Sequence, residues 1–266
     1  MVCLLACTGA NKRKPEEVAV KKSNHPHLVL VAWAVFLVAV VTLLVTAPKL
    51  WAIPFSKTKI IIEVNATAGD AGIQISVDAP GWTRLEVFDP NGLKIFESSG
   101  DGSVGLQGVT ELFFESAEPS FDELSLFELF DRFPRGMYTF VGVTTDGQTL
   151  TGKAPFTHFI PDEPTIVSPA EGATLNSKLP VVVDWEPVTA PFPGTDAGLK
   201  IVGYQVIVER VKPQPLRVFS VDLPALVTQV TVSPEFMQAK AEYNIEVLAI
   251  EAGGNQTIAE HRFKTQ

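Results

Sequence analysis

The strongest constraint on the fold of this chain is an alternation of apolar and polar side chains with a period of two residues. Near the C-terminus, Tyr243, Ile245 and Val247 alternate with Asn244 and Glu246. Successive side chains of a strand point to opposite faces, so this alternation is typical of a β-strand with one buried face. Similar stretches, separated by turn sequences, recur through most of the chain. The sequence therefore predicts an all-β body.

One uncharged segment, LVLVAWAVFLVAVVTLLVTA at 28–47, departs from this pattern. About 20 consecutive apolar residues are enough to span a bilayer as a helix. The basic residues before the segment predict that the tail at 1–27 stays in the cytoplasm and that the body lies across the membrane. These basic residues are Lys12, Arg13, Lys14, Lys21 and Lys22.

The hydrophobic segment has three interpretations. Its length favours an uncleaved transmembrane anchor, whereas KLWA at 49–52 offers a leader-peptide cleavage point after Ala52. The third is a helix buried in a soluble core. The first two place residues 53–266 outside the cytoplasm, in a single-pass membrane protein with its N-terminus inside or in a secreted or periplasmic protein. The membrane is an expected partner if residues 28–47 are retained.

The charge distribution argues against a nucleic-acid-binding body. The whole chain has a net charge of −9, and residues 1–52 contain six Lys or Arg and two Glu, so residues 53–266 carry −13. Binding to phosphates needs clustered basic side chains, which suit an acidic body poorly. Cys3 and Cys7 are the two cysteines. The body therefore has no disulfide, thiolate nucleophile or cysteine metal ligand.

Residues 57–161 are predicted to form a β-sandwich. DPNG at 89–92 and Asp146-Gly147 are turn sequences that join pairs of alternating strands. GDGSVG at 100–105 is followed by neither a lysine nor a predicted helix, so it is expected to be a hairpin turn rather than a phosphate loop.

A short helix is predicted to cross over within this sandwich. At 120–133 the apolar spacing changes to three and four residues, which indicates an amphipathic helix. Ser120 and Glu123 have the spacing of a capping box at its start.

A Pro-rich join at 161–172 leads into a second unit. Residues 162–266 contain about seven short alternating strands, a number and spacing that predict an immunoglobulin-like sandwich. The predicted fold class of the whole chain is all-β. It consists of two immunoglobulin-like β-sandwich domains in tandem, the first with a short helical crossover, preceded by one N-terminal hydrophobic helix.

The second unit resembles a fibronectin type III domain. Trp185 is expected to face inward on an early strand and Tyr204 on the next. Met237 holds the position of the family's leucine, six residues before a corner tyrosine at Tyr243, although Ala239-Lys240 replaces the usual Pro-Gly. The architecture is similar to secreted or membrane-anchored bacterial proteins that carry such domains. The resemblance implies a fold and no activity, because this fold hosts many unrelated functions.

The sequence points to no catalytic, metal or cofactor site. His158 and His261 lie in strand-like segments of different domains without zinc-ligand spacing or a nucleophile elbow, so both are expected to be structural or surface residues. Asn65 and Asn255 begin Asn-x-Thr triplets, which matter only where the host glycosylates exported proteins.

Carboxylates are the abundant reactive groups of the first domain. They are Glu111, Glu115, Glu118, Asp122, Glu123, Glu128 and Asp131. Charges on an amphipathic helix usually form its solvated face. A glycosidase instead needs two carboxylates across a cleft, and a cleft joining Glu115, Asp122 or Asp131 to a second carboxylate would favour that class.

These observations favour a non-enzymatic extracytoplasmic module for interaction, spacing or adhesion, with a protein or glycan as partner. One alternative is a cell-surface hydrolase that uses carboxylates of the first domain. Another is a tethered subunit of an envelope or export complex.

Phe192 is the one candidate partner-binding residue. It lies in TAPFPGTDAGL at 189–199, a connection longer than a simple strand turn needs. The flanking prolines stiffen its backbone, and a rigid exposed aromatic is typical of binding anchors. The alternative is that Phe192 folds back over its own domain or over the joint with the first domain.

Overall fold

The structure of the protein, a computed structural model, describes residues 51–266. The expected basic tail at 1–27 and the hydrophobic helix at 28–47 lie outside these residues. Within the described part, no helix has the length and apolar character needed to cross a membrane.

The described residues are mostly strands, which confirms the all-β prediction. The first part of the chain contains β1 (Ile53–Pro54), β2 (Lys57–Asn65), β3 (Asp70–Phe88), β4 (Lys94–Ser99), α2 (Gly102–Gln107), β5 (Val109–Glu115), α3 (Leu126–Arg132), β6 (Gly136–Thr144) and β7 (Thr149–Phe156). The second part contains β8 (Ile166–Ser168), β9 (Ala173–Leu175), β10 (Val181–Trp185), β11 (Ile201–Lys212), β12 (Arg217–Pro224), β13 (Gln229–Val232), β14 (Glu242–Glu251) and β15 (Gln256–Thr265).

One long strand, β3, organises the first part. Its first half pairs with β2 and β5, and its second half pairs with β4 and β6. Register shifts occur between Asp78 and Trp82, around the Ala-Pro-Gly sequence at 79–81. A strand that changes partners in this way contributes to two layers, with the core between them.

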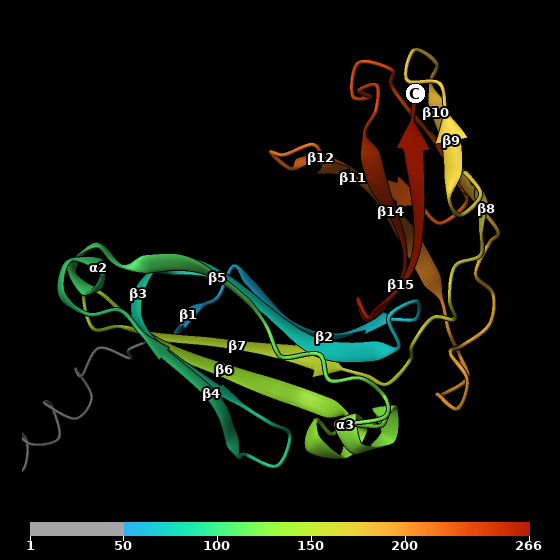
Figure 1. Cartoon of the computed structure of the whole chain (residues 1–266). Helices are drawn as coiled ribbons and strands as arrows, with labels where there is room; N and C mark the ends of the chain where they lie inside the picture. Colours follow the sequence, from blue (N-terminus) through green and yellow to red (C-terminus); the bar gives the residue numbers. More distant parts are fainter. Residues whose placement is uncertain (1–50) are drawn as a thin grey trace, which may run out of the picture. The chain divides into compact units, whose positions relative to one another are not determined.

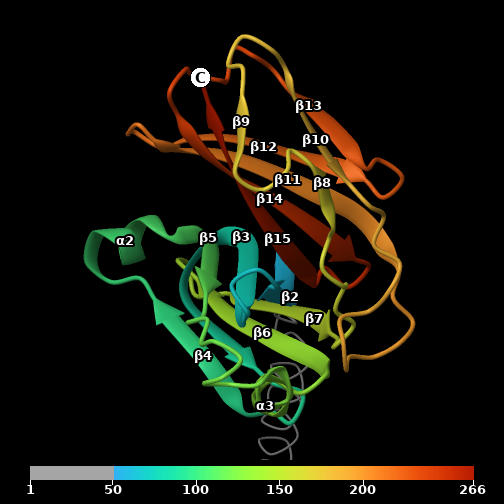
Figure 2. The same cartoon turned by 45° about the vertical axis from the view of Figure 1, so that its right-hand side comes forward.

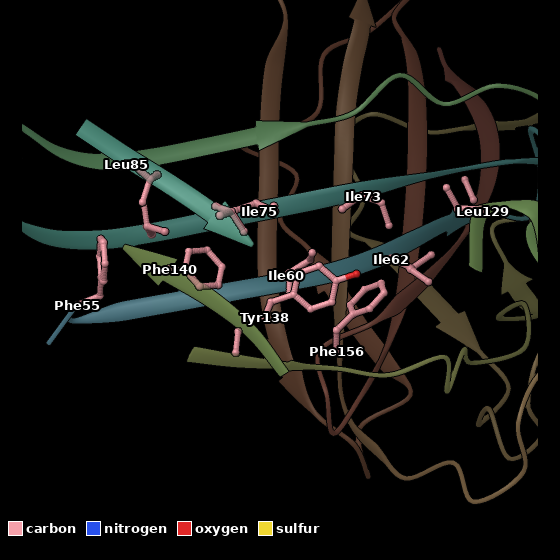
Figure 3. Close-up of a cluster of buried hydrophobic side chains, with 14 of the residues drawn as sticks. Phe55, Ile60, Ile62, Ile73, Ile75, Leu85, Leu129, Tyr138, Phe140 and Phe156 are labelled. Carbon is pink, nitrogen blue, oxygen red and sulfur yellow. The ribbon is translucent and has the colours of Figure 1, made fainter. Parts of the chain in front are cut away.

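The core between these layers is apolar. Figure 3 shows isoleucines of β2 and β3 facing aromatic rings of β6 and β7. The facing residues are Ile60, Ile62, Ile73, Ile75, Tyr138, Phe140 and Phe156. Leu126 and Leu129 of α3 close the same core.

The helical crossover is present, but it begins later than predicted. Helix α3 starts after Ser125, and its capping box uses Ser125 and Glu128 instead of Ser120 and Glu123. The Glu128 N–H donates to the Ser125 hydroxyl at 3.3 Å, and the Ser125 N–H donates to the Glu128 carboxylate at 3.0 Å. The earlier Ser-x-x-Glu instead forms a turn, in which the Ser120 carbonyl accepts from Glu123 N–H at 2.9 Å. The predicted hairpin turn at 100–105 is also corrected, because this stretch enters α2.

The second part is a sandwich of two sheets. Strands β13, β10 and β8 form one sheet, and β15, β14, β11 and β12 lie in the other. Trp185, Tyr204 and Tyr243 are buried between them, with the Trp185 and Tyr204 ring centroids 5.3 Å apart. The Tyr243 hydroxyl accepts from Gln238 N–H at 2.7 Å, which is the tyrosine-corner bond of such sandwiches. The predicted sandwich is confirmed.

A single sheet continues through both parts. Residues 63–65 of β2 pair in parallel with residues 256–258 of β15, so the strand order is β1-β7-β6-β3-β2-β15-β14-β11-β12. Figures 1 and 2 show β2 next to β15 at this joint. The two hydrophobic cores lie on either side of it and stay separate. A domain boundary at 161/162 stays a prediction.

Candidate functional site

The joint between the two parts is built around Asn255. This side chain is 1% exposed, and its amide N–H groups donate to the Thr157 and Phe159 carbonyls, each at 3.0 Å. Its amide oxygen accepts from Ile62 N–H at 3.0 Å. Because both amide hydrogens are used and the side chain is buried, the triplet at Asn255 is closed to glycosylation in the folded chain.

The residues after Asn255 strengthen the joint. The Thr257 hydroxyl donates to the Pro161 carbonyl at 2.6 Å, and the Gln256 amide donates to the Glu63 carboxylate. All three of these side chains are buried or nearly so. Buried polar groups with this many partners fix one arrangement of the surrounding backbone.

Three carboxylates meet on one face of the shared sheet, beside this joint. One oxygen from each of Glu63, Glu115 and Glu118 lies within 4.8 Å of the other two. Glu63 projects from β2, whereas Glu115 ends β5 and Glu118 follows it. The Gln74 amide on the intervening strand donates to Glu115 at 2.8 Å.

Gly72 provides the space for this cluster. A Cβ at this position would lie 2.8 Å from Cγ of Glu118, closer than real Cβ contacts. The missing side chain therefore lets Glu118 lie over β3. The neighbouring Ser116 hydroxyl accepts from Ile73 N–H at 2.9 Å and fixes the segment that carries Glu118.

Burial and crowding raise the pKa values of these acids. Partial burial, then the charges of Glu115, Asp70 and Glu63, raise the pKa of Glu118 to about 7. Burial also raises the pKa of Glu63, and the Gln256 hydrogen bond opposes this effect.

Glu246, a carboxylate of the same sheet outside the cluster, also has a raised pKa. Burial, then the charges of Glu209, Glu260 and Glu63, raise the pKa of Glu246 to about 7. Glu246 lies on β14 and Glu63 on β2, so the repulsion acts across the joint. Glu118 and Glu246 are therefore partly protonated near neutral pH.

The cluster brings three carboxylates together, whereas a glycosidase uses a pair. Glycosidase carboxylates are about 5 Å or more apart and flank a bound sugar. Here the three oxygens converge within 4.8 Å. Converging carboxylates can share protons or present oxygen ligands to a hard cation.

Sequence reasoning identified part of this cluster. Glu115 and Glu118 were candidate acids and are brought together, whereas Glu63 was missed. The signal for Glu63 was its polar side chain at the end of an isoleucine run in β2. Of the other candidate acids, Glu128 caps α3. Glu111, Asp122, Glu123 and Asp131 are exposed outside the cluster.

Phe192 lies half-buried against the first core. Its ring centroid is 6.2 Å from that of Phe121, and its N–H donates to the Ile160 carbonyl at 2.9 Å. The loop at 189–199 therefore folds back over the first part, as the alternative interpretation expected. A partner contact by the rest of the ring stays a prediction.

The folded-back loop and α3 border a pocket of about 400 Å³. Phe127, Phe130 and Asp131 line it from α3, and Thr195 and Asp196 line it from the loop. The Arg135 guanidinium binds the Asp196 carboxylate at 2.7 Å and links the two sides.

Both candidate histidines have structural hydrogen bonds. His158 Nε2 lies 2.9 Å from the Phe133 carbonyl, and the His158 ring stacks on Phe130 with centroids 4.0 Å apart. His261 Nδ1 lies 3.0 Å from the Pro169 carbonyl. The two rings therefore anchor backbone, and His158 also lines the pocket beside α3.

Comparisons with known proteins give only distant similarities. No protein-family model matches the chain, and no curated protein matches it. Among solved structures, it is similar to the FN1–FN3 domains of chicken CNTN1, with a TM-score of 0.31, 12% identity, and coverage of 80% of this chain and 68% of that chain. A two-domain fibronectin type III segment of chicken tenascin gives a TM-score of 0.27 and 13% identity, covering 79% of this chain and 99% of that chain.

A single fn3 domain of the human collagen alpha-1(XX) chain is also similar, with a TM-score of 0.25, 20% identity, and coverage of 40% of this chain and 82% of that chain. Residues 162–266 form a sandwich through the strand order of their two sheets and through the corner bond of Tyr243.

Proposed function

We propose that residues 53–266 act outside the cytoplasm as a non-catalytic binding and spacing unit in which the two sandwiches form one rigid element. The observation that carries this proposal is the joint. There β2 pairs in parallel with β15, and the adjacent Asn255 side chain forms hydrogen bonds through both its amide oxygen and its amide nitrogen. A spacer or adhesion module benefits from such a joint, because pre-organisation reduces the entropy lost when a partner binds.

The location rests on the sequence. A reporter that is active only in the cytoplasm, fused after Gln266, should be silent if the body is exported. An active reporter would contradict the proposed location. Mass spectrometry of the mature N-terminus then separates an anchor from a leader, since a chain that starts near Ile53 has been cleaved.

The binding role is tested on the native membrane. The full chain is expected to capture a partner there, and a variant with a loosened joint, Asn255→Ala, is expected to capture less of it. Equal capture by both proteins would show that the joint does not matter for binding. The absence of any specific partner would contradict the binding role itself.

An activity assay distinguishes the hydrolase alternative from the binding role. If the Glu63, Glu115 and Glu118 cluster were catalytic, hydrolysis of cell-surface glycans by the full chain should disappear in Glu115→Gln. Stable co-purification with a membrane assembly would instead identify the chain as a tethered subunit.

A further inference from the structure

The pocket beside α3 has walls that are fixed by the backbone. The Phe192 N–H donates to the Ile160 carbonyl at 2.9 Å, and Asp162 N–H donates to the Ala190 carbonyl at 3.0 Å. At the far end of the loop, the ion pair of Arg135 with Asp196 ties it to the segment after α3. The pocket is therefore already formed in the free chain, as small-ligand sites usually are.

Aromatic rings form the apolar part of the pocket. Phe127 is 60% exposed, and its ring meets that of Phe130 edge to face, with an interplanar angle of 86°. Phe130 in turn stacks on His158. A Cβ at Gly194 would lie 3.1 Å from Cζ of Phe127, so the loop backbone already lies close to this ring. Ring faces of this kind attract cations as well as apolar groups.

The polar part of the pocket consists mainly of hydrogen-bond acceptors. The Thr195 hydroxyl donates its hydrogen to the Phe192 carbonyl at 2.8 Å, which leaves its oxygen as an acceptor. The contact of His158 Nε2 with the Phe133 carbonyl places the proton on Nε2, so Nδ1 is also an acceptor. Burial lowers the pKa of His158, which favours the neutral ring over the charged one.

The carboxylates of the pocket add further acceptors. In the described part of the chain, the side-chain carboxylate of Asp131 has no hydrogen bond or ion pair, and the Asp196 carboxylate uses one oxygen for Arg135. The charge of Arg135 is offset by Asp196, so Asp131 leaves the pocket with a net negative charge. Among the described residues that line the pocket, the basic ones are Arg135 and His158, and Arg135 is the one that keeps its charge at any pH near neutrality.

We propose that this pocket binds the basic side chain, arginine or lysine, of a protein partner. Guanidinium and ammonium groups are pure donors, which matches a pocket whose polar groups are mostly acceptors and whose apolar lining is aromatic. A sugar matches less well, because each hydroxyl brings an acceptor with its donor. The proposal deepens the binding role given above and rests on it.

The test uses the full chain in nonionic detergent, with N-acetylarginine amide as the probe. Amide NMR signals of Gly194 and Thr195 should shift on titration. N-acetylcitrulline amide has a similar shape without the charge. It should bind about fivefold more weakly in the same titration, because it cannot form the charge-assisted contact. Equal shifts with citrulline, or stronger shifts with N-acetylglucosamine, would overturn the proposal.

Two variants locate the binding. Asp131→Asn and Phe127→Leu should each weaken binding of the arginine probe about three- to fivefold, which is the effect expected for loss of an exposed cation–π contact. Asp122→Asn, an exposed acid outside the pocket, should bind like wild type. Melting temperatures within one degree or so of wild type show that the variants are folded, since both side chains are exposed. Unchanged binding in both would overturn the proposal.

Partner capture distinguishes a failure of the pocket assignment from a failure of the binding role. If the wild-type chain captures a membrane partner and Asp131→Asn captures it equally well, the pocket assignment fails while the binding role stands. If the chain captures no partner, the binding role fails whatever the arginine titration shows.

Discussion

The side-chain oxygen of Asn255 accepts a hydrogen bond from the backbone N–H of Ile62 at 3.0 Å, although 193 positions separate the two residues. The same side chain also donates to the Thr157 and Phe159 carbonyls. One amide therefore connects β2, the segment after β7 and the start of β15. It fills the place where a flexible linker would be expected between tandem domains.

Replacement of Asn255 by alanine should reduce the free energy of unfolding by about 2–5 kcal/mol, because it leaves several buried backbone groups without partners. Urea denaturation of the full chain measures this loss. Asn176→Ala is the matched control, since its exposed amide bonds only to Lys178 N–H, and it should cost less than about 1 kcal/mol. Equal losses in the two variants would mean that Asn255 does not hold the joint.

The raised acid pKa values predict a loss of stability as pH rises. The pKa values of Glu118 and Glu246 are each raised from 4.5 to about 7, so the native state binds more protons than the unfolded state between these values. The contribution of these two carboxyl groups to the free energy of unfolding should therefore fall as pH rises from about 5 to about 8.

Urea midpoints at pH 5 and pH 8 measure this slope. Glu118→Gln and Glu246→Gln should each flatten it and raise the stability at pH 8. Glu111→Gln, on the same strand as Glu115 but outside the cluster, should leave the slope as it is. A slope that survives both cluster substitutions would contradict this account.

Lys240 has a backbone conformation that suits glycine. Its φ is +58°, in the left-handed region, at the position where fibronectin type III domains usually have the glycine of Pro-Gly. A left-handed conformation costs a non-glycine residue about 1–2 kcal/mol. Glycine removes this strain, but it also increases the entropy of the unfolded chain, which offsets part of the stabilisation. Lys240→Gly should therefore stabilise the chain by up to about 1 kcal/mol, seen as a higher melting temperature. Lys240→Ala keeps the strain and should show no gain.

Trp185→Ala should destabilise the second sandwich by about 3–5 kcal/mol, because a large ring is removed from a closed core. Trp185 is 2% exposed and packs on Tyr204. Val182→Ala on the same strand is a suitable control, since that side chain is 41% exposed. If both variants melt alike, Trp185 is not a core residue and the fibronectin-like core assignment fails.

Local patterns were sufficient to predict the strands. The alternation in β14 and the turn at Asp146-Gly147 depend on neighbouring residues, so both appeared where expected. The start of α3 was predicted five residues early, because two Ser-x-x-Glu sequences follow each other. The burial of Leu126 and Leu129 against the first core favours the later one, and this packing is tertiary.

The candidate site could be predicted only in part for the same reason. Glu63 lies more than 50 positions before Glu115 and Glu118 in the sequence. The three carboxylates meet only after β3 has paired with both β2 and β5. Likewise, the isoleucine run in β2 is typical of a strand but gives no sign that β15 is its neighbour. Phe192 had two interpretations at the sequence level, since proline stiffening is compatible with either direction of the ring.

The pairing of β2 with β15 also bears on how such a chain can be inherited and engineered. Tandem modules connected by a linker can be copied, reordered or excised as separate pieces. Here each module covers an open strand edge of the other, and an exposed edge invites pairing with a second molecule. A fragment cut near residue 161 is therefore expected to self-associate, and recombination should exchange the two modules only as a pair.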